Sequence, residues 1–281
     1  MVFLRTWCII TDMSIDMLEI FEYEFMQRAF IAGIFIAVLA SISGTFIVLK
    51  RYSMISETLA HAALVGVAVA LVAEYNPLWI AVIVSVISAW LIEYLRSTFA
   101  LYSDAVLAIL LSGSLAIAIV IVSLGGQFNS SLFSYLFGSI LSISNDDIIT
   151  IFIFGIFALG VLLLFAKEFY FIAYDEEVAQ TSGIKVKLLN YLLVTIVAII
   201  IALSIRIIGT LLIGALMVIP TVAALQFRVG FMQTALLSLF FAVLSVICGM
   251  LFSFYFSLPS GATIVLSVLC IFILSLLRNK K

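Results

Sequence analysis

The sequence predicts an all-α fold, a polytopic bundle of about eight or nine transmembrane helices. Of the 281 residues, 66% are hydrophobic and only 10% are charged, whereas soluble domains average roughly 45–50% apolar residues. Several uncharged runs also reach about 20 residues, the length that a helix needs to cross a hydrocarbon core of about 30 Å. These runs are continuous and do not alternate, which excludes the pattern of a transmembrane β-barrel.

Apolar runs and the breakers between them divide the chain into nine helical segments. In order, they cover residues 29–49, 54–73, 78–95, 105–124, 147–166, 188–205, 207–226, 233–255 and 260–278. A weaker apolar run, 128–143, predicts a half-helix or a surface helix. We interpret 1–28 as a peripheral extension, 29–278 as a single transmembrane domain and 279–281 as a cytoplasmic tail.

The positions of Lys and Arg predict the orientation, because short cytoplasmic loops carry an excess of these residues. With the N-terminus outside and the C-terminus inside, ten of the thirteen fall on the inner side, and only Arg5, Arg28 and Arg206 fall outside. The only sizeable inner connection is then 167–187, which is too short for a catalytic domain. The chain also lacks the G-x-x-x-x-G-K-[ST] phosphate loop, so energised transport would need an ion gradient or a partner.

Several other function classes find no support in the sequence. The net charge of −2 offers no basic patch for nucleic acid. Cys8, Cys248 and Cys270 lack a CxxC spacing, so neither a disulfide framework nor a thiolate metal site is indicated. An intramembrane zinc protease would show H-E-x-x-H, which is absent, and no second signature supports a serine protease.

The segment MISETLAHAAL, residues 54–64, contains the only histidine of the chain, His61, with Glu57 four positions before it. Residues at i and i+4 project from one face of a helix, and both side chains can donate lone pairs to a divalent cation. Two ligands are too few for a closed zinc site, but a two-fold dimer would supply four. In a structural alternative, Glu57 lies at the inner edge near Lys50 and Arg51 and only hydrogen-bonds His61.

Two further features concern helix packing. Ala62, Gly66 and Ala70 lie four residues apart in the same segment, and such a stripe of small residues lets another helix approach closely. Pro220 lies inside a membrane segment, where it removes a backbone hydrogen bond and predicts a kink.

The inner connection contains the sequence YDEEVAQTSG at 174–183. Asp175, Glu176 and Glu177 are typical of the first turn of a helix, where acids favour the dipole, and Gly183 is typical of a C-cap. A short amphipathic helix of this kind can dock into a groove of another protein. The alternative is a solvated loop.

Taken in order, four blocks resemble the membrane permease subunit of the bacterial ATP-binding-cassette importers for zinc, manganese and iron. The first is GTFIVLKRYSMISETLAHAALVGVA (44–68), in which a basic pair precedes an acid-x-x-x-His. The others are YLFGSIL with the following NDD, the A-x-x-x-G of DEEVAQTSG, and GTLLIGALMVIPTVAA. The resemblance covers about residues 26 to 278.

This resemblance implies an ABC type II importer-like permease that forms a homodimer in the bacterial cell (inner) membrane. The translocation path would lie between the two copies, with Glu57 and His61 as metal-binding residues. The partners would be a cytoplasmic ATP-binding subunit, which hydrolyses ATP, and an extracytoplasmic metal-binding receptor. The permease would hold no permanent cofactor and would transport Zn²⁺, or Mn²⁺ or Fe²⁺. The coupling segment would be centred on Asp175, Glu176, Glu177, Ala179 and Gly183.

Two departures from the family pattern bear on the cargo. The family usually has Asp where this chain has Glu57, which could shift the metal preference or leave Glu57 to orient His61. Manganese-type relatives often have a proline shortly after the His, whereas this chain continues HAALVGVA, which favours zinc over manganese or iron. A further alternative is an ion-coupled secondary transporter, with Glu57, Glu93 or Asp104 as the coupling carboxylate and no need for an ATPase.

Overall fold

The structure is a computed structural model that describes residues 23–99, 102–124, 130–138 and 144–278. Within these ranges the chain consists of helices joined by turns, so the all-α prediction is confirmed. The helices are α2 (Glu24–Leu49), α3 (Ile55–Val72), α4 (Pro77–Phe99), α5 (Ser103–Leu124), α6 (Ser130–Phe137), α7 (Asn145–Leu164), α8 (Ala166–Tyr174), α9 (Glu176–Thr181), α10 (Val186–Ile208), α11 (Ile213–Leu225), α12 (Phe231–Phe256) and α13 (Ser260–Arg278). Eight of the described helices are long and apolar enough to cross a membrane, and α11 is a shorter apolar helix.

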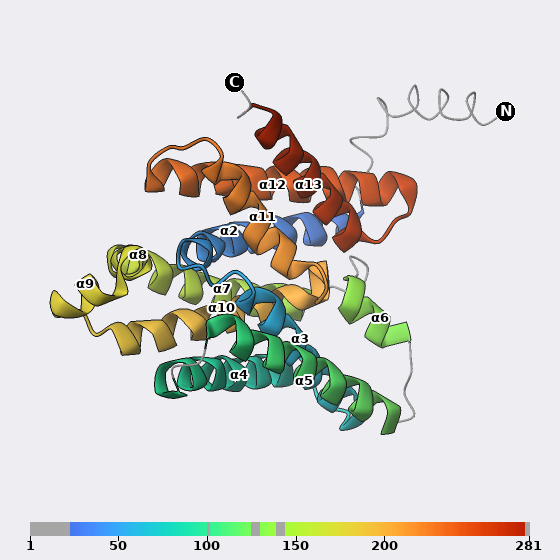
Figure 1. Ribbon diagram of the computed structural model, residues 1–281. Coiled ribbons are helices and arrows are strands. Elements are labelled where there is room, and N and C mark those ends of the chain that lie inside the picture. The colour runs from blue at the N-terminus through green and yellow to red at the C-terminus, as the bar shows by residue number, and fades with distance from the viewer. Residues whose placement is uncertain (1–22, 100–101, 125–129, 139–143, 279–281) are drawn as a thin grey trace.

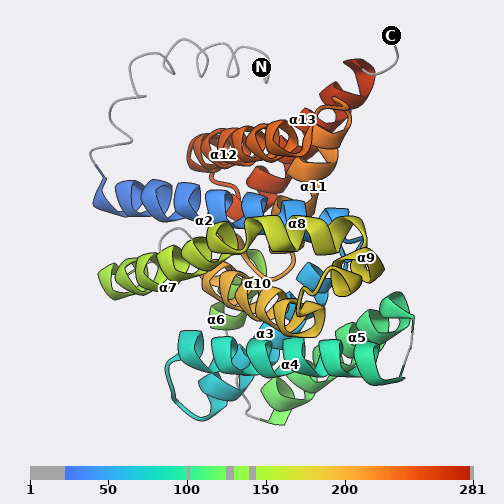
Figure 2. The same ribbon diagram turned by 90° about the vertical axis from the view of Figure 1, so that its left-hand side faces the viewer.

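The long helices form a core and two flanks. The most apolar window is 67% buried in α2 and 72% buried in α3 and α10, but only 22–33% buried in the other five. Helices α4 and α5 lie on one side of this core, and α12 and α13 lie on the other (Figures 1 and 2). Helix α3 packs mainly on α4 and α5, while α2 packs on α11 and α12. Helix α3, which carries the candidate metal ligands, is therefore an inner helix.

Small residues allow the core helices to approach one another closely. A Cβ added at Gly66 of α3 would lie 2.6 Å from the Cα of Ala81 in α4, and one added at Gly44 of α2 would lie 1.9 Å from the backbone oxygen of Met217 in α11. Ala62 and Ala70, the other members of the predicted stripe, are also buried. The stripe is thus a packing surface, as such stripes are in membrane bundles.

One predicted segment, 207–226, is divided differently in the structure. Helix α10 continues to Ile208, and α11 begins only at Ile213, because Gly209 adopts a φ of +91° that ends the helix. The amide of the next residue, Thr210, then donates to the backbone oxygen of Tyr135 in α6, at 2.9 Å. The tertiary contact with α6 replaces a helical hydrogen bond, which a reading of apolar runs could not anticipate.

The remaining boundaries differ less. The run 128–143 contains α6, whose eight residues extend about 12 Å, too short to cross a bilayer. Residues 24–28, expected in the extension, form the start of α2, while 1–22 and 279–281 lie outside the described residues. Pro220 lies inside α11, and a kink there stays a prediction. Helix α6 and the pair α8 and α9 lie at opposite ends of the bundle (Figure 1).

Candidate metal path and coupling segment

Helix α3 has one stripe that the other described residues cover only in part. Glu57 and Val69 are exposed and Val65 is half-buried, and these residues follow one another at a spacing of four with His61 among them. His61 itself is 5% exposed. Because residues four apart share a helix face, they form a continuous line, which we call the open stripe of α3 (Glu57, His61, Val65 and Val69).

The two candidate ligands do not satisfy each other. Nδ1 of His61 is buried and has no hydrogen-bond partner in the described part of the chain. Nδ1 therefore does not donate to Glu57, so in the structural alternative the hydrogen bond from His61 would have to come from Nε2. Leaving a buried polar atom unpaired costs free energy, so we expect this nitrogen to find a partner beyond the described residues, in water, in a bound ion or in another part of the assembly.

The depth of Glu57 follows from helix geometry. Gly66 of α3 lies against Ala81 of α4, and from that level the two helices run toward the same end of the bundle. At a rise of 1.5 Å per residue, Glu57 lies about 14 Å along α3 from Gly66. Phe99, at the end of α4, lies about 27 Å along that helix from Ala81. Glu57 is thus recessed by about 13 Å from the end of α4.

Helix α11 borders the same site. A Cβ added at Gly214 would lie 3.6 Å from the Cβ of Glu57, so the first turn of α11 lies beside the base of this side chain. A charged side chain that faces lipid costs up to roughly 2.5–3.5 kcal/mol, the value of insertion scales at the centre of a membrane helix. We therefore expect the exposed side of Glu57 to face water or another protein chain.

The chain by itself offers few ligands at this site. Among the described residues, no group of three or more His, Cys, Asp or Glu side chains could hold a metal ion. Glu57 and His61 together provide two donor side chains, fewer than a closed zinc site requires. Further ligands would have to come from water or from a second copy of the chain.

The predicted coupling segment forms a capped helix. The Oδ1 atom of Asp175 accepts hydrogen bonds from the amides of Glu177 and Val178, both at 3.0 Å, which makes Asp175 the N-cap of α9. Gly183 follows the C-cap with a φ of +86°, a conformation that favours glycine. Ala179 is fully buried, whereas Glu177 and Val178 are exposed. Helix α9 is therefore anchored on one face and open on the other.

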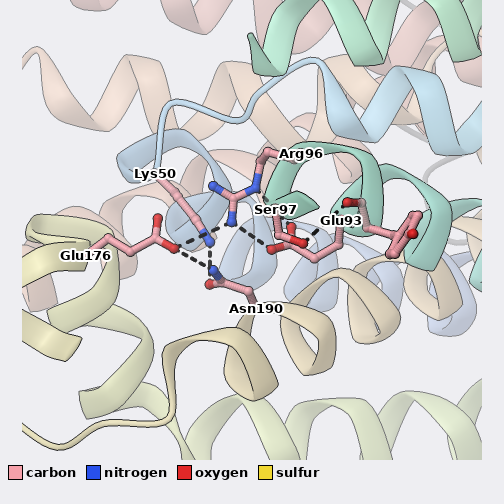
Figure 3. Close-up of polar contacts among 7 residues, drawn as sticks. Lys50, Glu93, Arg96, Ser97, Glu176 and Asn190 are labelled. Atoms are coloured by element: carbon pink, nitrogen blue, oxygen red, sulfur yellow. Dashed lines mark hydrogen bonds and ion pairs between the residues drawn. The ribbon is translucent and has the colours of Figure 1, made fainter. Parts of the chain in front are cut away.

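Glu176 points the other way, into a group of charged and polar residues that sequence reasoning missed (Figure 3). Its Oε1 accepts a hydrogen bond from Nδ2 of Asn190 at 2.8 Å and lies 3.5 Å from Arg96. The amide oxygen of Asn190 in turn accepts a hydrogen bond from Lys50. Arg96 also makes a two-pronged contact with Glu93, at 2.7 and 3.1 Å. We call these five residues, from α4, α9, α10 and the end of α2, the inner cluster.

The inner cluster is electrically balanced, with two cations and two carboxylates. Burial, together with the nearby charge of Arg96, lowers the pKa of Lys50 to about 8. Burial alone would raise the pKa of Glu176, but the positive charges of Lys50 and Arg96 outweigh it, so this pKa is lowered. Glu93 is 1% exposed and paired with Arg96, and hence is not a free carboxylate for ion coupling.

A second ion pair lies at the other end of the bundle. Asp147 in the first turn of α7 pairs with Arg206 in the last turn of α10. Asp147 also completes a capping box with Ser144, the N-cap of α7. The S-x-x-D pattern of this box is visible in the sequence, but its long-range partner is not.

Comparisons with known proteins place this geometry in context. The model of a family described as "ABC 3 transport family" matches residues 22–279. A protein of Treponema pallidum named "Probable metal transport system membrane protein" is 36% identical over 88% of this chain and 93% of its own length. The high-affinity zinc uptake system membrane protein of Haemophilus influenzae is 29% identical over 92% and 99%. The manganese transport system membrane protein of Listeria monocytogenes is 27% identical over 92% of each chain.

A solved structure is similar over the same extent. It is that of PsaBC from Streptococcus pneumoniae in complex with Fab, which aligns with a TM-score of 0.82 at 26% identity and covers 92% of this chain and 94% of that chain. The similarity thus extends over most of both chains.

Proposed function

The chain belongs to the ABC 3 transport family, and on this premise we propose that it is the membrane permease subunit of an ATP-driven importer of a divalent transition metal, with zinc as the favoured cargo. The observation that carries the proposal is the open stripe of α3. It carries the exposed carboxylate of Glu57, about 13 Å inside the end of α4, and the buried imidazole of His61, about 6 Å deeper, whose Nδ1 has no partner among the described residues. Ionisable residues at such depth usually mark an ion pathway.

In the proposed assembly, two copies of the chain place their open stripes of α3 face to face. Each copy contributes an imidazole nitrogen from His61 and a carboxylate from Glu57, so the pair of copies offers four ligands. Without a partner, each copy has too few donors among its described residues. A transport site must also release its cargo, and an open, doubled two-ligand site suits transient binding better than a closed four-ligand site within one chain.

The pair of an imidazole and a carboxylate suits a divalent transition metal, since imidazole binds zinc or iron and carboxylate binds harder ions such as manganese. Zinc is the favoured cargo because the chain has no proline shortly after His61. Relatives of similar identity carry names for zinc and for manganese transport, so manganese or iron is the alternative cargo within the same function.

We propose that α9 docks on a separate ATP-binding subunit, which supplies the hydrolysis. Its outer face, with Glu177 and Val178, is free for this contact, while Asp175, Ala179 and Gly183 shape and anchor the helix. The end of the bundle with α9 would lie in the cytoplasm of a bacterial cell. The N-terminus would then be outside, where a metal-binding receptor delivers the cargo, and the C-terminus inside.

The function is tested by metal uptake into proteoliposomes that contain the chain, its ATPase and its receptor. We expect ATP-dependent accumulation of Zn²⁺ that exceeds that of Mn²⁺ and Fe²⁺ presented at the same concentration. Preferential uptake of Mn²⁺ or Fe²⁺ would change the cargo and leave the importer in place. Uptake driven by a proton or sodium gradient without ATP would overturn the importer in favour of the secondary transporter.

The docking face is tested by co-purification of the ATPase. The double variant Glu177→Lys/Val178→Ser reverses a charge and removes an apolar contact on the exposed face while leaving the anchored face intact. We expect it to lose the ATPase but to remain in the membrane. The matched control, Asp146→Asn, removes an exposed acid at the other end of the bundle and should retain the ATPase. Retention by both variants would remove α9 from the docking surface.

A further inference from the structure

We propose that the inner cluster (Lys50, Glu93, Arg96, Glu176 and Asn190) is the mechanical link that transmits movement of α9 to the open stripe of α3. This inference rests on the proposed function and adds Arg96 and Asn190, which neither the sequence motifs nor the comparisons assign. Its members come from four helices or helix ends that lie far apart in the sequence, yet hydrogen bonds and ion pairs connect them all (Figure 3). In this role they are positioning residues that do not touch the metal.

The first part of the link joins α9 to the membrane helices. Glu176 stands next to the N-cap Asp175 and is bound by Asn190 of α10 and Arg96 of α4. Asn190 is 2% exposed and Glu93, the partner of Arg96, is 1% exposed. The side chain of Glu176 itself is 41% exposed, and its hydrogen bond from Asn190 is strengthened by the charge of the carboxylate. A displacement of α9 therefore pulls on α4 and α10 through fixed contacts.

The second part joins the cluster to α3. Lys50 is the residue after α2, and it donates to Asn190. The turn that follows is held by backbone hydrogen bonds from Tyr52 to Ile47 at 2.9 Å and from Ile55 to Tyr52 at 3.0 Å. The guanidinium of Arg96 also lies 5.8 Å from the centre of the Tyr52 ring.

The consequence for the metal site follows from the length of this connection. Glu57 belongs to the first turn of α3, directly after the turn that carries Lys50 and Tyr52. A shift of the inner cluster therefore moves Glu57 as well, because the backbone hydrogen bonds of the intervening residues restrict their movement. One set of contacts therefore joins the open stripe of α3 to α9. Binding of the ATPase at α9 and binding of metal at Glu57 would both change the position of this set of residues.

The test separates coupling from assembly. In the complete transporter, Lys50→Met removes the cation of the link, and Glu176→Gln removes the charge that binds Arg96 with a side chain of equal size. We expect both variants to bind the ATPase and hydrolyse ATP, while the Zn²⁺ transported per ATP falls about fivefold to tenfold. The matched control, Arg51→Met, removes the exposed neighbouring cation and should keep the wild-type ratio.

A second readout does not depend on transport. Hydrogen exchange of the α3 amides is measured with and without the bound ATPase, and we expect the ATPase to alter exchange in the first turns of α3 in wild type but not in Lys50→Met. If the wild-type transporter takes up no metal, the proposed importer is refuted. The hydrogen-exchange measurement would still show whether the inner cluster connects α9 to α3. If both variants keep the wild-type transport ratio and the wild-type exchange response, the link is overturned. Loss of ATPase binding in the variants would also overturn it, because the cluster would then be needed to fold α9.

Discussion

The substitution Gly66→Ala tests how closely the path helix must pack. An added Cβ at Gly66 would lie 2.6 Å from the Cα of Ala81 and 2.8 Å from the backbone oxygen of Ile80. Ordinary van der Waals contact begins at 3.4 Å, so α3 and α4 must separate by about 0.8 Å. The obstacle is backbone, which cannot rotate away as a side chain can.

The expected cost is about 1–3 kcal/mol, the usual penalty for overpacking a core. Replacing a helical glycine by alanine also brings a gain of helix propensity of up to about 1 kcal/mol. Gly113→Ala in α5 is the matched control, because it makes the same exchange in a helix but its Cβ would meet nothing within 4 Å. The difference between the two variants therefore isolates the clash.

The assay is thermal unfolding of the purified protein in detergent, followed by metal uptake. We expect Gly66→Ala to unfold at a lower temperature than Gly113→Ala. We also expect slower uptake, because a shift of about 0.8 Å exceeds the roughly 0.5 Å tolerance of a functional constellation. Equal unfolding temperatures and equal uptake for the two variants would refute the close packing of α3 on α4 and its importance for the site.

Two further predictions concern buried charges. The pKa of Lys50 is about 8, below its ordinary value of 10.5, so between these pH values the folded protein has lost a proton that the unfolded chain keeps. The stability of wild type relative to Lys50→Met should therefore rise by about 1 kcal/mol between pH 7 and pH 9; a constant difference in thermal unfolding across this range would contradict the burial of Lys50. Asp147→Asn breaks the pair with Arg206 and should cost about 2 kcal/mol, whereas Asp146→Asn, at an exposed position, should change stability by less than about 0.5 kcal/mol. Equal denaturation midpoints for these two variants would show that the pair with Arg206 contributes nothing.

Much of the architecture could be predicted because it depends on local patterns. Apolar length located the long helices, and the small-residue spacing at Gly66 identified a face of α3 that packs closely. The acids at 175–177 and Gly183 predicted the start and end of α9, as the N-cap hydrogen bonds and the positive φ confirm. Each of these features is encoded within one or two helical turns.

The rest depends on contacts between distant residues. Lys50 and Asn190 are 140 residues apart, and Asp147 and Arg206 are 59 residues apart, so no local pattern pairs them. Helical spacing placed Glu57 and His61 on one face but carried no information on depth, which depends on where Gly66 meets Ala81 in α4. Which of the three acids of α9 turns inward likewise depends on Asn190.

The central claim, that the open stripe of α3 carries the metal, is tested most directly by ATP-dependent Zn²⁺ uptake with His61→Ala beside wild type. The measurement uses proteoliposomes with the complete transporter, and ATPase binding confirms that the variant is assembled. We predict that uptake falls by about tenfold or more, because the imidazole is one of the two donor side chains that the described chain offers at this site. Uptake equal to that of wild type, from an assembled complex, would contradict the claim and leave His61 a structural residue.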